Sequence, residues 1–189
     1  MQRLLARLVN GALIVLAFAV GTTALWKTLF AVPARGPTTT YQEIQEKLEG
    51  STVRPFTVQF PDSSIGTVPV PGPRPTLLYL MRTTCAACRV NAPAWKDLAT
   101  RAQGLAHVVV LSAEDLATLT TYQAGFGVGV TAHIPEEERD RVYAEYYMNA
   151  TPTVYLIGPD GRVERLWVGV FPEELPDQYL DILNAWETS

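Results

Sequence analysis

Cys85 and Cys88 are the only two cysteines of the 189-residue chain, and two alanines separate them. Thiols at this spacing can form a redox-active disulfide, a structural crosslink or half of a metal site. The apolar run TLLYLM (residues 76–81) predicts a strand buried on both faces, and helical spacing follows from about Cys88 to Gly104. Cys85 is therefore expected at a helix N-terminus, where unpaired N–H groups and the helix dipole favour a thiolate.

The two sulfurs have different predicted roles. A thiolate is the attacking species in thiol–disulfide exchange, so Cys85 is predicted to be the nucleophile. Cys88 lies one helical turn further on and is placed to attack the mixed disulfide and release the product. Arg82 is interpreted as an exposed, solubilising arginine, with added positive potential at the thiolate as the alternative.

Other uses of the cysteines fit less well. A structural disulfide around two residues would restrain little of the unfolded chain. A zinc site would need two more ligands, and His107 and His133 lie too far apart in the sequence for a zinc motif. A peroxidatic cysteine would want a threonine at the position of Arg82. We expect no metal and no organic cofactor, because the electrons of the Cys85–Cys88 pair reside on the sulfurs.

The rest of the chain indicates strands alternating with helices. Thr40 and Glu43 form a capping box for a short helix that ends near Gly50. Further elements are expected as strands at residues 53–60 and 107–112, a helix capped by Ser112 with Asp115, a helix from Pro135 to about Tyr147 with the proline as its first residue, a hairpin turning at residues 159–161, and a helix at residues 173–187. This order predicts an α/β fold with a mixed central sheet flanked by helices.

The N-terminus has the composition of a membrane segment. Residues 8–26 carry no charge, and Arg3 and Arg7 precede them. A helix of this length would measure about 28 Å, close to the hydrocarbon thickness of a bilayer. We expect a transmembrane anchor over residues 1–30, and a cleaved signal peptide with Ala17-Phe18-Ala19 as its cleavage site is the alternative.

Both interpretations place the rest of the chain outside the cytoplasm, because positive residues before a span stay on the cytoplasmic side. That compartment tolerates disulfides. We expect a single-pass protein of the cytoplasmic (inner) membrane, with a tether and short helix at residues 31–50 and an extracytoplasmic, periplasmic domain at residues 51–189. Residues 36–189 hold 11 basic and 19 acidic side chains, which argues against a nucleic-acid partner.

The motifs together resemble the thioredoxin superfamily. The resemblance rests on the buried strand, the CxxC pair, Pro93 five residues past Cys88, and the segment ATPTVYLIGPDGRV (residues 150–163). With the expected anchor, the layout is most similar to membrane-anchored extracytoplasmic thiol-disulfide oxidoreductases, including those that serve cytochrome c maturation. The resemblance covers residues 51–189 and implies a thioredoxin-like fold.

It also implies roles for particular residues. Pro152 would be cis and pack against the cysteine pair, and the backbone of Thr151 would pair with an extended substrate segment. Pro93 would kink the active-site helix, the alternative being a helix that starts late. Two positions depart from the family: Thr84 stands before Cys85 where an aromatic is common, and Tyr79 replaces a buried acid that often assists proton transfer.

The sequence thus predicts a thiol-disulfide oxidoreductase that exchanges disulfides with protein thiols or disulfides. If it acts as a reductant, it would need a transmembrane electron donor. The alternative is a non-catalytic binding module of the same fold, anchored at the membrane, for which Thr84 and Tyr79 are the best support.

Overall fold

The computed structural model describes residues 40–123, 129–147 and 149–187. The expected anchor over residues 1–30 and most of the tether lie outside these ranges. Among the helices inside them, none is both long and apolar enough to cross a bilayer.

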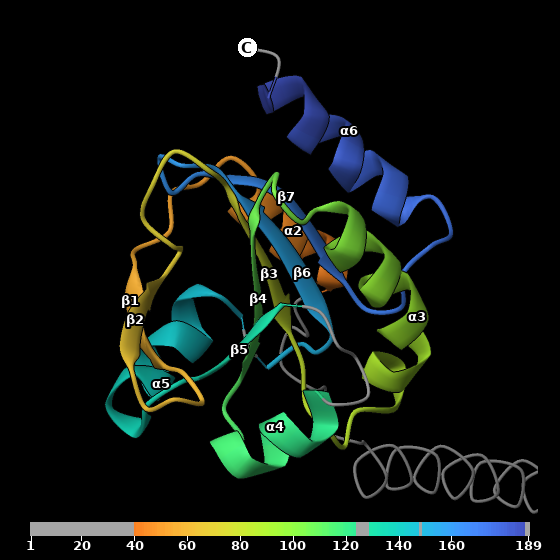
Figure 1. The fold of residues 1–189 in the computed structure, drawn as a ribbon. Helices are drawn as coiled ribbons and strands as arrows, with labels where there is room; N and C mark the ends of the chain where they lie inside the picture. The colour runs from red at the N-terminus through yellow and green to blue at the C-terminus, as the bar shows by residue number, and fades with distance from the viewer. Residues whose placement is uncertain (1–39, 124–128, 148, 188–189) are drawn as a thin grey trace, which may run out of the picture. The chain divides into compact units, whose positions relative to one another are not determined.

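A seven-stranded mixed sheet forms the centre of the fold (Figure 1), in the order β2-β1-β5-β4-β3-β6-β7. Its strands are β1 (Phe56–Gln59), β2 (Ile65–Val68), β3 (Thr76–Leu80), β4 (His107–Ser112), β5 (Val130–His133), β6 (Thr153–Ile157) and β7 (Val163–Val168). β3, β4 and β5 run parallel, and the other neighbours are antiparallel. All five residues of β3 are buried, as its unbroken apolar run predicts.

Helices cover both faces of the sheet (Figure 1). They are α2 (Tyr41–Leu48), α3 (Ala86–Arg101), α4 (Leu116–Gln123), α5 (Glu136–Glu145) and α6 (Leu175–Glu187). Alternate side chains of β3 divide between two cores. Leu77 and Tyr79 pack with residues of α3 and α6, whereas Leu78 and Leu80 pack with residues of α2 and α5. The predicted α/β architecture with helices on a mixed sheet is confirmed.

The short helix α2 begins with the predicted capping box, in which Thr40 and Glu43 bond reciprocally. It lies against β7: the Gln45 side chain donates to the carbonyl oxygen of Leu166, and Glu49 accepts from the N–H of Leu166 at 2.9 Å. The helix is therefore fixed to the sheet at its outer strand.

Several helix starts differ from the sequence prediction by a few residues. The active-site helix α3 begins at Ala86 rather than about Cys88, because Cys85 itself caps it. In α4 the capping side chain is that of Asp115, which accepts from Thr118, while the Ser112 hydroxyl bonds to Glu114. Pro135 is the N-cap of α5 rather than its first residue, and α6 begins at Leu175 rather than at residue 173.

The predicted hairpin joins β6 and β7. Gly161 lies at φ +81°, which is a conformation that glycine adopts without strain. Its N–H donates to Gly158, and Asp160 accepts from the N–H of Arg162. This turn fixes the register of β6, whose N-terminal end leads back to the cysteines.

Candidate active site

Cys85 and Cys88 lie at the N-terminus of α3, directly after the buried strand β3. Cys85 is the N-cap, and its sulfur accepts the backbone N–H of Cys88 at 3.1 Å. Cys85 is half-buried, whereas Cys88 is fully buried, and both are free thiols. The predicted placement of Cys85 at a helix N-terminus is confirmed.

The buried thiol of Cys88 is a weak acid. Burial, followed by hydrogen bonding with Cys85, raises the pKa of Cys88 to about 12. Cys88 therefore keeps its proton at neutral pH, behind the half-buried sulfur of Cys85. The two sulfurs therefore differ in exposure, and the roles that the sequence predicts for them stay a prediction.

The turn before β6 meets the pair from the other side. The Thr151–Pro152 peptide bond is cis, as the resemblance implies. The Cys85 thiol donates to the carbonyl oxygen of Thr151 at 3.5 Å. The carbonyl oxygen of Pro152 accepts from Gly169, so the cis turn is held by the start of the segment after β7.

Tyr79 lies beneath Cys88 in an aromatic cluster. Its ring stacks on Trp95, with centroids 4.6 Å apart, and meets the edge of Phe171 at 6.1 Å. Its hydroxyl donates to the carbonyl oxygen of Cys88 at 3.5 Å. Burial, and then the nearby Cys88, raise the pKa of Tyr79 well above its usual value. Tyr79 is therefore a packing residue that keeps its proton, and it does not reproduce the chemistry of a buried acid.

The two other supporting residues from the sequence lie at the surface. Thr84 is exposed directly before Cys85. Pro93 is exposed in the middle of α3, and the helix runs from Ala86 through it to Arg101, so the alternative of a helix that starts late is wrong. Pro93 has no N–H to donate, which leaves the carbonyl of Arg89 without its usual helical partner.

Glu114, which follows β4, is not among the site residues predicted from the sequence. Its carboxylate accepts from the backbone N–H of Thr83 at 2.8 Å and from the Thr83 hydroxyl at 2.9 Å. Thr83 lies two residues before Cys85. No local pattern distinguishes this glutamate from an ordinary loop acid, since its partner is 31 residues away.

Asn91 was also missed. It is 2% exposed on α3, donates to the carbonyl oxygen of Gly169 at 2.8 Å and accepts from the N–H of Phe171 at 2.9 Å. These bonds hold Phe171 against Tyr79. An amide between Cys88 and Trp95 on the apolar face of the predicted helix was the available signal.

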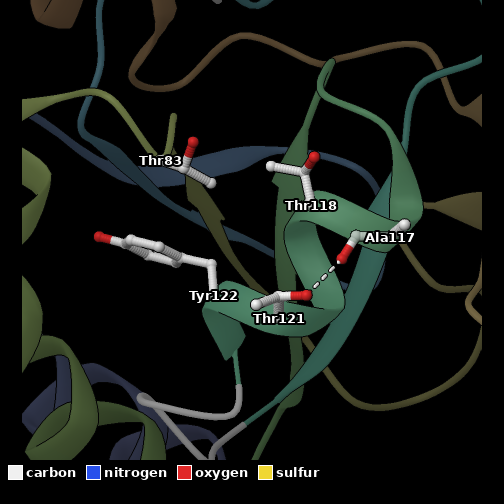
Figure 2. A pocket seen from close by; sticks show the side chains of 5 residues that line it. All are labelled: Thr83, Ala117, Thr118, Thr121 and Tyr122. Atoms are coloured by element: carbon white, nitrogen blue, oxygen red, sulfur yellow. Dashed lines mark hydrogen bonds between the residues drawn. The ribbon is translucent and has the colours of Figure 1, made fainter.

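A pocket of about 700 Å³ opens beside the active-site turn (Figure 2). Its lining residues are Thr83, Ala117, Thr118, Thr121 and Tyr122. The ring of Tyr122 packs on the same core as Cys88. Burial first, and then the Cys88 sulfur, raise the pKa of Tyr122. The pocket thus adjoins the cysteine pair.

The two histidines lie apart. His107 opens β4, and burial lowers its pKa. His133 ends β5, and its Nδ1 bonds to the carbonyl oxygen of Glu114 at 2.7 Å. Within the part of the chain that the structure describes, no cluster of three or more potential metal ligands occurs.

Comparison with known sequences finds no matching family model and no matching curated protein. Solved structures do match. The thioredoxin domain of a thiol-disulfide oxidoreductase from Bacteroides vulgatus aligns with a TM-score of 0.64 at 12% identity, covering 72% of this chain and 98% of that one. A thio-disulfide isomerase from Thermus thermophilus gives 0.60 at 16% identity, covering 71% and 96%. A putative thiol:disulfide interchange protein DsbE from Chlorobium tepidum gives 0.60 at 20% identity, covering 71% and 97%. These similarities establish a thioredoxin-like fold for the chain.

Proposed function

We propose that the chain is a thiol-disulfide oxidoreductase that acts on protein substrates through Cys85 and Cys88. The observation that carries the proposal is the asymmetry of the pair. Cys85 is accessible and receives the N–H of Cys88, while Cys88 is buried behind it with a pKa of about 12. The fold shared with proteins described as thiol-disulfide oxidoreductases supports it.

In the reducing direction the Cys85 thiolate attacks a substrate disulfide. A bond forms between Cys85 and one substrate sulfur, and the other substrate sulfur leaves as a thiolate. That thiolate takes the proton of Cys88, whose own thiolate then attacks the sulfur of Cys85. The bond between Cys85 and the first substrate sulfur breaks, and that sulfur leaves as a thiolate that takes a proton from water. The products are the Cys85–Cys88 disulfide and two substrate thiols, with two electrons transferred to the substrate. The reverse sequence delivers a disulfide.

The substrate would lie beside Thr151 and Pro152. An extended segment can pair with backbone groups at an exposed turn, which gives affinity with little dependence on side chains. The contact between the Thr151 carbonyl and the Cys85 sulfur supports this location, because a segment paired there would lie within reach of the attacking atom.

The narrower proposal is that residues 1–30 anchor the domain on the extracytoplasmic side of the inner membrane. It is supported by the uncharged run at residues 8–26, which follows Arg3 and Arg7 in the sequence. The resemblance to enzymes of cytochrome c maturation makes haem-attachment cysteines the substrate to test first, with a transmembrane electron donor to re-reduce the pair.

A trapping experiment tests the function. Cys88→Ser removes the resolving thiol, so covalent complexes with substrate proteins should accumulate and disappear on adding dithiothreitol. Cys85→Ser is the matched control and should trap nothing. If wild type exchanges disulfides with glutathione while Cys88→Ser traps no partner, the assigned roles are wrong.

A non-catalytic binding module is the second candidate, and Tyr79 is the observation that favours it. Its protonated hydroxyl stands where the family often has a carboxyl. An insulin-reduction assay on the full chain discriminates between the two. The absence of turnover in this assay and in glutathione exchange would favour the binding module.

A further inference from the structure

We propose that Glu114 is a positioning residue for Cys85: its carboxylate holds the turn at residues 82–85 that presents the attacking sulfur. The inference rests on the proposed exchange function and adds to it a residue outside the CxxC motif. Glu114 follows β4 and belongs to neither α3 nor the cis-proline turn.

The carboxylate binds the middle of the turn. The turn is closed by the N–H of Cys85, which donates to the carbonyl oxygen of Arg82 at 3.1 Å. Thr83 lies between them, and Glu114 accepts both its N–H at 2.8 Å and its hydroxyl at 2.9 Å. A carboxylate accepting a backbone N–H forms a charge-assisted hydrogen bond, which is among the stronger kinds in proteins.

The remaining polar group of Thr83 is also engaged. Its carbonyl oxygen accepts from the guanidinium of Arg89 at 3.5 Å. Arg89 lies in the first helical turn of α3. The turn at residues 82–85 is therefore held through Thr83 by two groups, Arg89 and Glu114. Of the two, Glu114 makes the shorter contacts.

Glu114 is itself fixed to the sheet. Ser112 donates its hydroxyl to the carboxylate at 3.3 Å and accepts the N–H of Glu114 at 3.2 Å. The carbonyl oxygen of Glu114 bonds to His133 at 2.7 Å. Ser112 and His133 are partners in the register of β4 and β5, so the rigid sheet sets the position of the carboxylate.

The position of this turn determines the contacts of the Cys85 sulfur. It lies 3.1 Å from the N–H of Cys88 and 3.5 Å from the carbonyl oxygen of Thr151, and both contacts depend on where the turn places Cys85. Release of Thr83 would let the turn move and lengthen the bond from Cys88. Since that bond stabilises the charged sulfur, its loss would reduce the thiolate available at neutral pH.

Alkylation of the reduced full-length chain tests the proposal without any turnover. The rate of iodoacetamide reaction at Cys85 is measured from pH 4 to 10, with Cys88 protected by burial. In Glu114→Ala the pH of half-maximal rate should rise by about one unit, which means about tenfold less thiolate at a pH below both midpoints. Exchange with glutathione disulfide at pH 7 should slow accordingly.

Three further variants serve as controls: one separates positioning from charge, one tests general stability, and one removes a single contact. Glu114→Gln keeps an oxygen that can accept the Thr83 N–H and an NH₂ group that can donate to the Thr83 hydroxyl. The rate of alkylation at a given pH should therefore stay within about twofold of wild type. Glu138→Ala removes a carboxylate on α5 that also accepts a backbone N–H, that of Thr57, and should leave the pH profile unchanged. Thr83→Ala, which removes only the hydroxyl contact, should give a partial shift even if Glu114→Ala does not fold.

An unchanged profile in folded Glu114→Ala, or in Thr83→Ala where Glu114→Ala does not fold, would overturn the proposal. So would a midpoint that falls in both Glu114→Ala and Glu114→Gln, because removing a negative charge near the sulfur favours the thiolate, and charge rather than positioning would then be responsible. If the alkylation shift appears while wild type exchanges no disulfides, positioning holds and the proposed function fails. If wild type exchanges disulfides and the shift is absent, the proposed function holds and the positioning role of Glu114 fails.

Discussion

The backbone N–H of Cys88 points at the sulfur of Cys85, at 3.1 Å, so the second cysteine stabilises the first through its main chain. Its own sulfur is buried and protonated. One residue thus has two separate tasks at the site. In the proposed mechanism its backbone supports the attacking Cys85 thiolate, and its side chain resolves the mixed disulfide.

The pKa of Cys88 predicts how the second chemical step depends on pH. In the proposed mechanism only the Cys88 thiolate attacks the mixed disulfide, and burial, the largest cause that raises the Cys88 pKa in the dithiol, persists when Cys85 is bonded to substrate. Between pH 6 and 9 the thiolate is therefore a small fraction that grows about tenfold per pH unit. The rate of product release from a preformed mixed disulfide, measured by stopped flow, should rise with that slope. A plateau near pH 8 would contradict the raised pKa.

Tyr79→Phe should separate packing from proton transfer. The substitution keeps the stack on Trp95 and removes a hydroxyl whose bond to Cys88 is long, at 3.5 Å. We expect a loss of about 0.5–1 kcal/mol in the free energy of unfolding and an unchanged exchange rate. Tyr179→Phe is the matched control, since Tyr179 is a buried tyrosine that donates to the carbonyl of Val154. A tenfold fall in exchange for Tyr79→Phe alone would show that the hydroxyl takes part in the reaction.

Pro93→Ala should stabilise the protein. Pro93 is exposed within α3, and alanine would restore an N–H that can bond to the carbonyl of Arg89. Helix propensity favours alanine by about 3 kcal/mol, and the lost rigidity of the unfolded chain offsets about 1 kcal/mol of that. Urea unfolding should therefore show a net gain of about 2 kcal/mol. Lys96→Ala, an exposed substitution on the same helix, should change stability by less than about 0.5 kcal/mol. A loss of stability in Pro93→Ala would show that the proline fits a bend the helix needs.

Local patterns predicted β3, α3 and the position of the cysteine pair between them, because each is encoded within a few neighbouring residues. The run TLLYLM has the composition of a buried strand, and the caps and turns have recognisable residue types. β5 was missed because only four residues, Val130–His133, form it, and its place in the sheet is set by pairing with β4. β2, at the sheet edge, was missed because its four residues, Ile65–Val68, include a glycine and lack an apolar alternation.

The contacts that position the site were outside the reach of those patterns. Glu114 meets Thr83 across 31 residues, and Asn91 meets Gly169 across 78 residues. Such pairs are created by the topology of the sheet rather than by neighbouring residues. The residue types of the motif were therefore predictable, and the residues that hold the motif in place were not.

Asn91→Ala tests the second of these long-range contacts. Asn91 is 2% exposed, and its amide bonds both Gly169 and Phe171, so alanine would leave a half-buried carbonyl and a half-buried N–H without these partners. Each unsatisfied group costs about 1–3 kcal/mol, and we expect about 2–4 kcal/mol of lost stability in urea unfolding. Gln45→Ala, which removes one half-buried amide bond to Leu166, should cost about 1 kcal/mol. Because Phe171 packs on Tyr79, the near-ultraviolet dichroism should also change in Asn91→Ala and not in the control. Equal losses in the two variants, with unchanged dichroism, would show that Asn91 does not hold the aromatic cluster beneath Cys88.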